Sequence, residues 1–445
     1  MDLFGTDGIR GEVNEDITPE LALKLGKSTS VITEKGDSVL VCTDTRQSGR
    51  SLQYALASGI SSVGRNAYIM NVLPTPGIPL LMDRLDAQLG AVVSASHNLA
   101  QDNGIKFFGS DGLKLTPNVE QKLEKFIITG DGERWVNWEE IGNIFAIEDS
   151  EDLYLESLKE RLGSELPDLT GLELNLDCAH GATYHVAPRI ISELGAELNA
   201  IGVDPSGFNI NQNCGSTSLD RLKKKVVSQG SDLGIAFDGD GDRALFVDEE
   251  GNEVDGDRVL YFAAQYLKEQ GELEPPVVVS TIMSNLGLEK SLSRIGIDLV
   301  RTQVGDKYVA QEMLKRDAII GGEQSGHVIF RDVNTTGDGI VTALMVLKVL
   351  KATGKKLSDL GSGMLRYPQV LENVPTDNKE DFQADDKIQT EIDKWEEVLG
   401  EEGRILVRPS GTQDVIRVMV EGKNQDHAEK VAGKLGDYID SVLNG

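Results

Sequence analysis

The sequence predicts an α/β fold made of three α/β domains and a smaller α+β domain at the carboxyl end. Through the first three-quarters of the 445 residues, short β-rich runs alternate with longer helical patterns. This alternation is typical of α/β layers with largely parallel sheets. Three apolar strands end in polar, glycine-containing loops, at Ser94–Asn98, Asp238–Arg243 and Gly321–His327. Because ligands of open α/β sheets bind beyond the carboxyl ends of strands, we expect each loop to form one edge of a shared cleft.

The individual elements follow from this alternation in chain order. We expect strands at residues 38–42, 66–73, 89–93, 173–180, 232–237, 276–282, 297–303 and 318–321. We expect helices at residues 49–64, 182–194, 218–229, 285–294 and 307–316. A chain of this length exceeds one ordinary hydrophobic core, so several domains are expected.

The composition changes after about residue 355. A helix is expected at 385–399, where apolar residues recur at helical spacing, and a last helix at 428–442. Between them, residues 405–407 and the alternating residues 416–420 predict an antiparallel pair of strands. This segment therefore forms the small α+β domain. We place the four domains at residues 1–150, 151–253, 254–366 and 367–445.

The charge balance argues against two classes of partner. The chain has 44 basic and 73 acidic residues, a net charge of −29. Such a field repels nucleic acid and anionic membranes, so we expect neither as a partner. It also repels a sugar phosphate, so any phosphate site must be a local cationic pocket.

The cysteines and the apolar runs bear on the cellular compartment. Cys42, Cys178 and Cys214 fit no zinc pattern, and their odd number argues against a disulfide framework. We expect free and mostly buried thiols in a reducing cytoplasm. No apolar run reaches the roughly 20 residues that span a bilayer, and we expect no signal peptide.

Three carboxylates alternate in the second polar loop, at Asp238, Asp240 and Asp242. In an extended segment this spacing places them on one side of the chain. Carboxylates without histidine or cysteine favour Mg²⁺ over zinc. An EF-hand is excluded because Arg243 occupies the position that needs glycine. A solvated acidic turn remains the alternative, and Arg243 can either hold the loop or meet a substrate phosphate.

The first polar loop offers a hydroxyl, Ser96, that can carry a phosphoryl group. No Gly-x-Ser-x-Gly pattern surrounds it, which disfavours an α/β-hydrolase. In extended backbone the neighbouring His97 side chain points away, so we expect it to orient or pack rather than to act as base. A turn and a short strand follow. They can return Lys106 over the serine loop or leave it in solvent, and both alternatives stay open.

Two further segments carry polar groups suited to a sugar phosphate. Glu323 and Ser325 can hydrogen-bond sugar hydroxyls, and His327 can titrate near neutral pH. Arg408–Thr412, with Arg417 beyond the turn, has the cations and hydroxyls of a phosphate cradle. A tight turn and a hairpin with incidental arginines are the respective alternatives. No Walker A or Rossmann glycine pattern occurs, which disfavours nucleotides.

Together these motifs resemble the α-D-phosphohexomutase superfamily. The resemblance runs from Phe4–Gly11 to Arg417–Gly422, nearly the whole chain, and four separate motifs occur in the family order. It implies three related α/β domains and a TATA-binding-protein-like C-terminal domain around a central cleft. It also implies an isomerase that interconverts glucosamine 6-phosphate and glucosamine 1-phosphate, a step toward UDP-N-acetylglucosamine.

The resemblance also implies the cofactors and their residues. Ser96 matches the phosphoserine, and the reaction passes through a sugar bisphosphate. Asp238, Asp240 and Asp242 match the ligands of one Mg²⁺ per site, with a phosphate oxygen on Ser96 completing the set.

The resemblance assigns catalytic and substrate-binding roles to other residues. Arg10 and Lys106 match cations near the transferring phosphoryl group, and Lys106 and His327 match acid/base candidates. The residues matched to substrate binding are Arg243, Glu323, Ser325, Arg408, Ser410, Gly411, Thr412 and Arg417. The implied partner is a small hexosamine phosphate, and the sequence leaves a homodimer open.

The chain departs from the family pattern at two loops. Leu99 stands where the family usually has proline after Ser-His-Asn, and Gln413-Asp414 stands where it has Glu-Pro. Without these two prolines the loop backbones are less constrained. Asp414 adds negative charge near the expected phosphate site, which works against phosphate affinity. The alternatives that the residues leave open are a mutase of mannose or glucose phosphates, a metal-dependent sugar phosphatase and a non-catalytic sugar-phosphate sensor.

Overall fold

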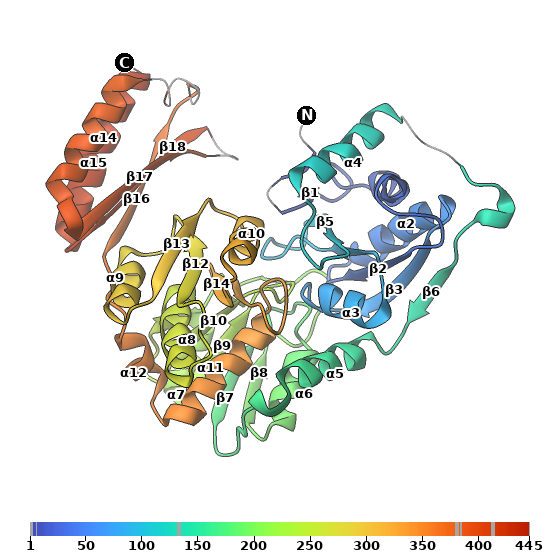
Figure 1. Cartoon of the computed structure of the whole chain (residues 1–445), viewed down its shortest axis with the longest axis horizontal. Helices are drawn as coiled ribbons and strands as arrows, with labels where there is room; N and C mark the ends of the chain where they lie inside the picture. The colour runs from blue at the N-terminus through green and yellow to red at the C-terminus, as the bar shows by residue number, and fades with distance from the viewer. Residues whose placement is uncertain are drawn as a thin grey trace. The chain divides into compact units, whose positions relative to one another are not determined.

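The computed structural model describes residues 3–5, 7–130, 135–378, 382, 385–410 and 414–444. The chain divides into two compact units, which are described separately (Figure 1). Unit 1 contains residues Met1–Met283 and Ile297–Ser362, and unit 2 contains Ser284–Gly296 and Gly363–Gly445.

The first sheet of unit 1 has six strands. Their order is β1 (Ile9–Glu12), β5 (Asp102–Gly109), β4 (Leu89–Val93), β2 (Ser38–Thr43), β3 (Asn66–Val72) and β6 (Ile144–Ile147). β4, β2, β3 and β6 are parallel, whereas β5 runs antiparallel to both β4 and β1. The helices of this segment are α1 (Pro19–Ser28), α2 (Gly49–Ser62), α3 (Gly77–Leu85) and α4 (Pro117–Thr129).

The second sheet has five strands. Their order is β11 (Glu253–Val254), β10 (Ala244–Asp248), β9 (Leu233–Phe237), β7 (Glu173–Asp177) and β8 (Glu197–Ile201). The helices of this segment are α5 (Ser150–Leu162), α6 (Val186–Glu193) and α7 (Asp220–Gln229). The expected strand at 173–180 and helix at 182–194 are both shorter in the structure. Ala179 and His180 have φ angles of 54° and 50°, in the left-handed region that neither a strand nor a right-handed helix uses.

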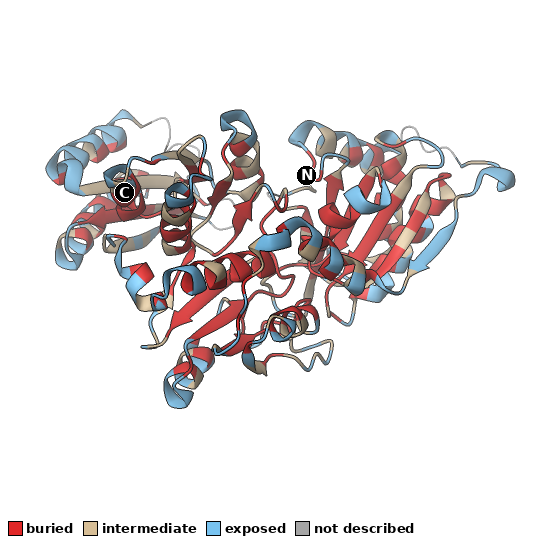
Figure 2. Ribbon diagram, turned by 60° about the horizontal axis from the view of Figure 1, so that its bottom comes forward, coloured by how far each residue is buried: buried red, intermediate tan, exposed pale blue. Residues whose placement is uncertain are grey.

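The third sheet has four strands. Their order is β13 (Asp298–Thr302), β12 (Val277–Thr281), β14 (Ile320–Gly322) and β15 (Val328–Phe330). The helices of this segment within unit 1 are α8 (Gly256–Gln270), α10 (Asp306–Arg316), α11 (Gly339–Thr353) and α12 (Leu357–Ser362). The central strands of the sheets are buried and so is most of α11, whereas helices such as α4 and α7 expose one side (Figure 2).

The three sheets share one arrangement that the sequence did not predict. In each, the polar loop joins a strand to an antiparallel neighbour: β4 to β5, β9 to β10 and β14 to β15. The sheets are therefore mixed, with parallel strands on one side of that pair. A short loop cannot make the crossover that a parallel neighbour requires, so the chain turns back antiparallel.

Unit 2 has a three-stranded antiparallel sheet. The order is β16 (Gln369–Pro375), β18 (Val415–Gly422) and β17 (Gly403–Pro409), with α9 (Leu286–Arg294), α14 (Asp386–Leu399) and α15 (Gln425–Leu443). The predicted strand pair and both C-terminal helices are therefore confirmed. The buried carboxylate of Glu421 on β18 pairs with Arg404 and accepts a hydrogen bond from the Leu286 N–H at 3.1 Å, which ties α9 to this unit.

Two further expectations concern the cysteines and membrane-spanning helices. Cys42, Cys178 and Cys214 are free and buried, as predicted. Among the described residues, no helix combines the length and apolar character that a bilayer crossing needs.

Candidate active site

Ser96 lies just beyond the carboxyl end of β4 and is fully buried. Its φ angle is 50°, in the left-handed region that serine rarely adopts. In this conformation the Ser96 hydroxyl donates a hydrogen bond to Oδ2 of Asp238 at 2.7 Å. The first two polar loops therefore meet, as the strand-end argument predicted.

The second loop follows β9 and presents three buried carboxylates, those of Asp238, Asp240 and Asp242. One oxygen of each lies within 4.8 Å of the others. A Cβ at Gly239 would lie 2.5 Å from the Ser96 carbonyl oxygen, so only glycine lets this loop approach the serine loop so closely.

The carboxylates have the properties of a cation site. Oδ1 of Asp240 and Oδ1 of Asp242 are buried and find no hydrogen-bond partner among the described residues. Buried polar atoms are normally satisfied, so these two oxygens suit a ligand. Burial, reinforced by the charges of Asp242 and Asp240, raises the pKa of Asp238 well above its usual range. A bound divalent cation relieves this repulsion, and the residues therefore fit Mg²⁺.

Lys106 lies on β5 opposite Val92 and is 2% exposed, so it is not the solvated lysine that the sequence left open. Its Nζ donates to Oδ2 of Asp240 at 2.6 Å and lies 3.9 Å from carboxylate oxygens of Asp7 and Asp242. Burial alone would lower the pKa of Lys106, but the charges of Asp240 and Asp7 outweigh it and raise the pKa. Lys106 is therefore a buried ammonium directed at the carboxylates.

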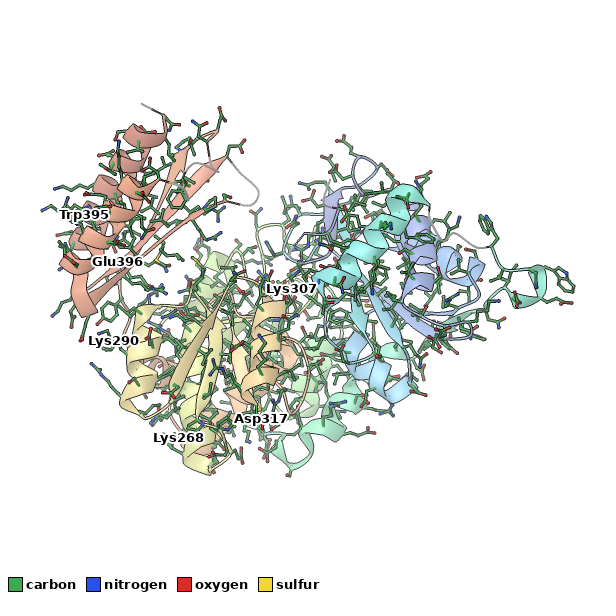
Figure 3. The ribbon with its side chains drawn as sticks, turned by 45° about the horizontal axis from the view of Figure 1, so that its top comes forward. Lys268, Lys290, Lys307, Asp317, Trp395 and Glu396 are labelled. Carbon is green, nitrogen blue, oxygen red and sulfur yellow. The ribbon has the colours of Figure 1, made fainter. Side chains whose placement is uncertain are left out.

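A second group of charges borders the first. Asp7 pairs with both Arg10 and Lys114, and Lys114 reaches Asp306 at 2.5 Å. Lys307, at the start of α10 (Figure 3), lies 3.5 Å from Glu120.

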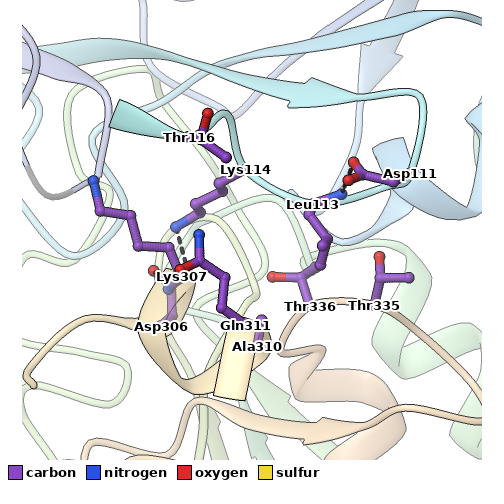
Figure 4. A pocket seen from close by; sticks show the side chains of 10 residues that line it. All are labelled: Asp111, Leu113, Lys114, Thr116, Asp306, Lys307, Ala310, Gln311, Thr335 and Thr336. Atoms are coloured by element: carbon purple, nitrogen blue, oxygen red, sulfur yellow. Dashed lines mark hydrogen bonds and ion pairs between the residues drawn. The ribbon is translucent and has the colours of Figure 1, made fainter. Parts of the chain in front are cut away.

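Side chains from this group line a cavity of about 90 Å³, in which Lys114 points to Asp306 (Figure 4). The cavity lies between the loop that precedes α4 and the start of α10. Both of its lysines face carboxylates, so the cavity itself offers no surplus positive charge.

His327 follows β14 beside Asp242 of the second loop and is 2% exposed. Its Nδ1 is 3.5 Å from Oδ2 of Asp242, and its Nε2 accepts a hydrogen bond from the Gly337 N–H at 3.0 Å. Burial opposes a charge on His327, but Asp242 outweighs burial and raises the pKa. The Gly337 contact requires an unprotonated Nε2 and therefore opposes that rise. The geometry places the Nδ1 proton toward Asp242.

Of the other predicted site residues in unit 1, Arg243 borders the same carboxylates. Arg243 Nε lies 3.7 Å from Asp242, and Arg243 Nη1 lies 3.4 Å from His97 Nδ1. Glu323 accepts a hydrogen bond from the Gly305 N–H at 3.2 Å, and Ser325 donates to Glu323 at 3.4 Å. The hydrogen bonds to the Glu323 carboxylate thus fix the third polar loop.

The two arginines expected to form a phosphate cradle lie in unit 2. Arg408 on β17 lies directly opposite Arg417 on β18. Burial, together with the Arg417 charge, lowers the pKa of Arg408, so an anion between them would be favourable. Ser410 is buried and follows β17, whereas Gly411 and Thr412 lie outside the described residues.

Sequence reasoning missed the residues that hold the serine loop from behind. Asp44 and Arg46 form a buried ion pair at 2.9 Å, and Arg46 and Asn211 both donate to the Ser96 carbonyl. A signal was available, because Asp44-Thr45-Arg46 directly follows the apolar strand β2. The rule that found the other polar loops applies to this one too.

Family models match this architecture segment by segment. Those for Phosphoglucomutase/phosphomannomutase alpha/beta/alpha domains I, II and III match residues 1–134, 152–251 and 255–367. The model for the C-terminal domain of the same family matches residues 371–436. This fold therefore holds a buried serine against a trio of carboxylates. The chain belongs to the phosphoglucomutase/phosphomannomutase family.

Individual relatives agree with this assignment. The phosphoglucosamine mutase of Carboxydothermus hydrogenoformans is 50% identical over 447 residues, covering 99% of each chain. That of Desulforamulus reducens is 47% identical over 444 residues, again covering 99% of each chain. A solved family protein from Burkholderia thailandensis has 23% identity and a TM-score of 0.83, covering 100% of this chain and 98% of its own. The fold is therefore shared well beyond the similar sequences.

Proposed function

We propose that this chain is an isomerase that interconverts glucosamine 6-phosphate and glucosamine 1-phosphate. The observation that carries the chemistry is the 2.7 Å contact between the Ser96 hydroxyl and Asp238 within a carboxylate trio. The observation that favours the amino sugar is the shared activity of full-length relatives at 50% and 47% identity. The product, glucosamine 1-phosphate, would be a precursor of UDP-N-acetylglucosamine.

In the proposed reaction, Ser96 carries a phosphoryl group. The free hydroxyl of the sugar monophosphate attacks the phosphorus, the bond to Ser96 Oγ breaks, and a sugar bisphosphate forms. The sugar hydroxyl loses its proton as it attacks, and the departing Ser96 Oγ takes up one proton. The Ser96 hydroxyl that results keeps this proton and can donate a hydrogen bond to Asp238, as it does in the structure. The bisphosphate then turns over and returns its other phosphoryl group to Ser96, so phosphate is conserved.

The residues around Ser96 have distinct proposed roles. Asp238, Asp240 and Asp242 would hold Mg²⁺, with an oxygen on Ser96 as a further ligand, and the ion supplies positive charge to the phosphoryl oxygens. Lys106 remains charged beside them and can donate a proton to a departing oxygen. Arg10 and Arg243 add positive charge at the edge of the same group. For His327, burial and the Asp242 contact favour orienting that carboxylate.

The substrate is proposed to be held by groups away from the transferring phosphoryl. Glu323 and Ser325 would accept and donate hydrogen bonds to sugar hydroxyls. Arg408, Ser410, Gly411, Thr412 and Arg417 would bind the phosphate that is not being transferred.

A turnover assay tests the proposal. The purified protein is given glucosamine, glucose or mannose 6-phosphate with Mg²⁺ and trace bisphosphate. We expect the highest kcat/KM for glucosamine 6-phosphate, and accumulation of bisphosphate rather than free phosphate. A preference for mannose 6-phosphate would reassign the substrate, and stoichiometric release of inorganic phosphate would make the protein a phosphatase.

We further propose a homodimer. Trp135 and Trp138 are 68% and 80% exposed, and they precede the exposed edge strand β6. In the described part of the chain β6 is the last strand of its sheet, and exposed aromatic residues beside such an edge favour contact with a second copy. Sedimentation equilibrium of the wild type and of Trp138→Ala measures the oligomeric state.

We also propose a cytoplasmic location, which free buried thiols and an acidic surface suit. Cell fractionation tests it.

A further inference from the structure

Arg46 lies beneath the serine loop and is 3% exposed. An arginine has five N–H donors in a rigid fork, and Arg46 uses each of them. Nε donates to Asp44 Oδ2 at 2.9 Å. Nη1 donates to the carbonyl oxygens of Leu99 and Asp102, the latter at 3.0 Å. Nη2 donates to the carbonyls of Ser96 at 3.0 Å and Asn98 at 2.8 Å.

Asp44 also connects to the N–H of Ser96, through the Ser94 hydroxyl. Its Oδ2 also accepts a hydrogen bond from the Ser94 hydroxyl at 2.6 Å. The Ser94 Oγ in turn accepts the N–H of Ser96 at 3.0 Å. Ser96 is therefore held at its N–H through Asp44 and Ser94, and at its carbonyl by Arg46 together with Asn211.

These hydrogen bonds stabilise a backbone conformation at Ser96 that L residues disfavour. Its φ angle is 50°. Such a conformation persists only where its surroundings determine it. If the loop relaxed, the hydroxyl would turn away from Asp238 and the carboxylate trio.

We propose that Arg46, held by Asp44, is a positioning residue that keeps Ser96 in the geometry for phosphoryl transfer. The inference rests on the proposed role of Ser96 as the phosphoryl carrier. Among the described residues, Arg46 touches neither the carboxylate trio nor any side chain assigned to substrate, so its effect on turnover passes through the loop backbone. Lysine cannot replace it, because one ammonium cannot reach four carbonyl oxygens and a carboxylate together.

The test compares Arg46→Lys with a matched control, Arg65→Lys. Arg65 is 7% exposed and donates to the carbonyls of Ser30, Thr33 and Val63, away from the serine loop. We expect Arg46→Lys to lower kcat about 100-fold, the cost of misplacing a reacting group by about 1 Å. KM for glucosamine 6-phosphate should change less than about twofold, since the groups proposed to bind it are intact. Arg46→Lys and Arg65→Lys should lower Tm by similar amounts, but Arg65→Lys should keep the wild-type kcat.

Two other measurements separate positioning from loss of structure. Calorimetry should show unchanged Mg²⁺ affinity in Arg46→Lys, because Arg46 does not contact the carboxylates. In Arg46→Ala, low millimolar guanidinium chloride should restore part of the single-turnover rate of transfer from phosphorylated Ser96. If neither Arg46 variant folds, Ser94→Ala leaves Arg46 in place and removes both the hydrogen bond to the Ser96 N–H and the one that Ser94 donates to Asp44. Its kcat should fall about tenfold, the equivalent of about 1.4 kcal/mol.

The outcomes distinguish this inference from the proposed function. If Ser96→Ala kept wild-type turnover, the proposed function would fail. If Ser96 were essential while Arg46→Lys or, where needed, Ser94→Ala kept wild-type kcat, the positioning role alone would be wrong. Equal losses of kcat in Arg46→Lys and Arg65→Lys would also overturn it.

Discussion

The hydroxyl of Ser96 and the carboxylate of Asp238 lie 2.7 Å apart although 142 residues separate them in the chain. Each residue follows a buried strand, β4 or β9, of a different sheet. Gly239 permits the approach, because any side chain there would collide with the Ser96 carbonyl. The site is thus assembled from the ends of two independent sheets.

We predict that Ser96→Ala loses covalent phosphate and nearly all mutase activity, because the phosphoryl carrier is removed. Intact-mass measurement and the turnover assay check this. Ser61→Ala is the matched control: Ser61 is also buried in this segment, but its hydroxyl donates to the Gly142 carbonyl. Phosphate mapped to Ser94 instead of Ser96 would move the carrier by two residues.

We predict that Asp240→Asn weakens Mg²⁺ binding at least about tenfold. Even outer-shell partners of metal ligands cost that much, and a direct ligand should cost no less. Titration calorimetry measures the affinity. Asp248→Asn serves as control, because Asp248 is equally buried but holds the turn after β10. Full turnover in metal-free buffer would contradict the requirement for a cation.

We predict a pH-dependent contribution of Asp338 to stability. Burial raises the pKa of Asp338 to about 6, although it caps α11 and accepts a hydrogen bond from Tyr154 at 2.9 Å. A raised pKa means that the protonated form is favoured in the folded state. Its contribution is fully present below about pH 4 and is lost as the pH rises through 6. The loss is about 3 kcal/mol, from roughly two pKa units.

The measurement is urea denaturation of wild type and Asp338→Asn between pH 4 and 7. Asparagine keeps a cap oxygen but does not titrate, so the difference in unfolding free energy should shift in favour of the variant as the pH rises. Asp385→Asn, with the same cap chemistry at the start of α14, supplies the comparison. A constant difference across this range would contradict the prediction.

We predict that Arg408→Ala raises KM for glucosamine 6-phosphate by roughly 10- to 100-fold. A hydrogen bond to a charged group contributes about 1.5–3 kcal/mol, and the partner Arg417 alone cannot replace it. Steady-state kinetics give KM, and intact mass should show unchanged phosphate on Ser96. Lys423→Ala removes an exposed charge of the same unit as control. An unchanged KM would mean that the hairpin is not the phosphate site.

Local pattern alone predicted most helices and strands and the polar loops that carry the site. The helix expected at 307–316 is α10, and the strand expected at 38–42 is β2. Such elements are readable because burial of one face imposes a period on the residues within a single window. The spacing of the three aspartates is local in the same sense, and their convergence was predictable from it.

Tertiary structure alone decided which of these groups meet and in what state. Lys106 was equally compatible with solvent, and only the antiparallel return of β5 buries it against Asp240, 134 residues away. The buried position of His327 and the grip of Arg46 on the serine loop likewise depend on contacts between distant segments. The sequence determined which groups stand at the strand ends. Pairing between strands decided how far apart these groups lie and which protonation state each one favours. Burial and neighbouring charge set both, and they belong to the folded chain rather than to any one segment.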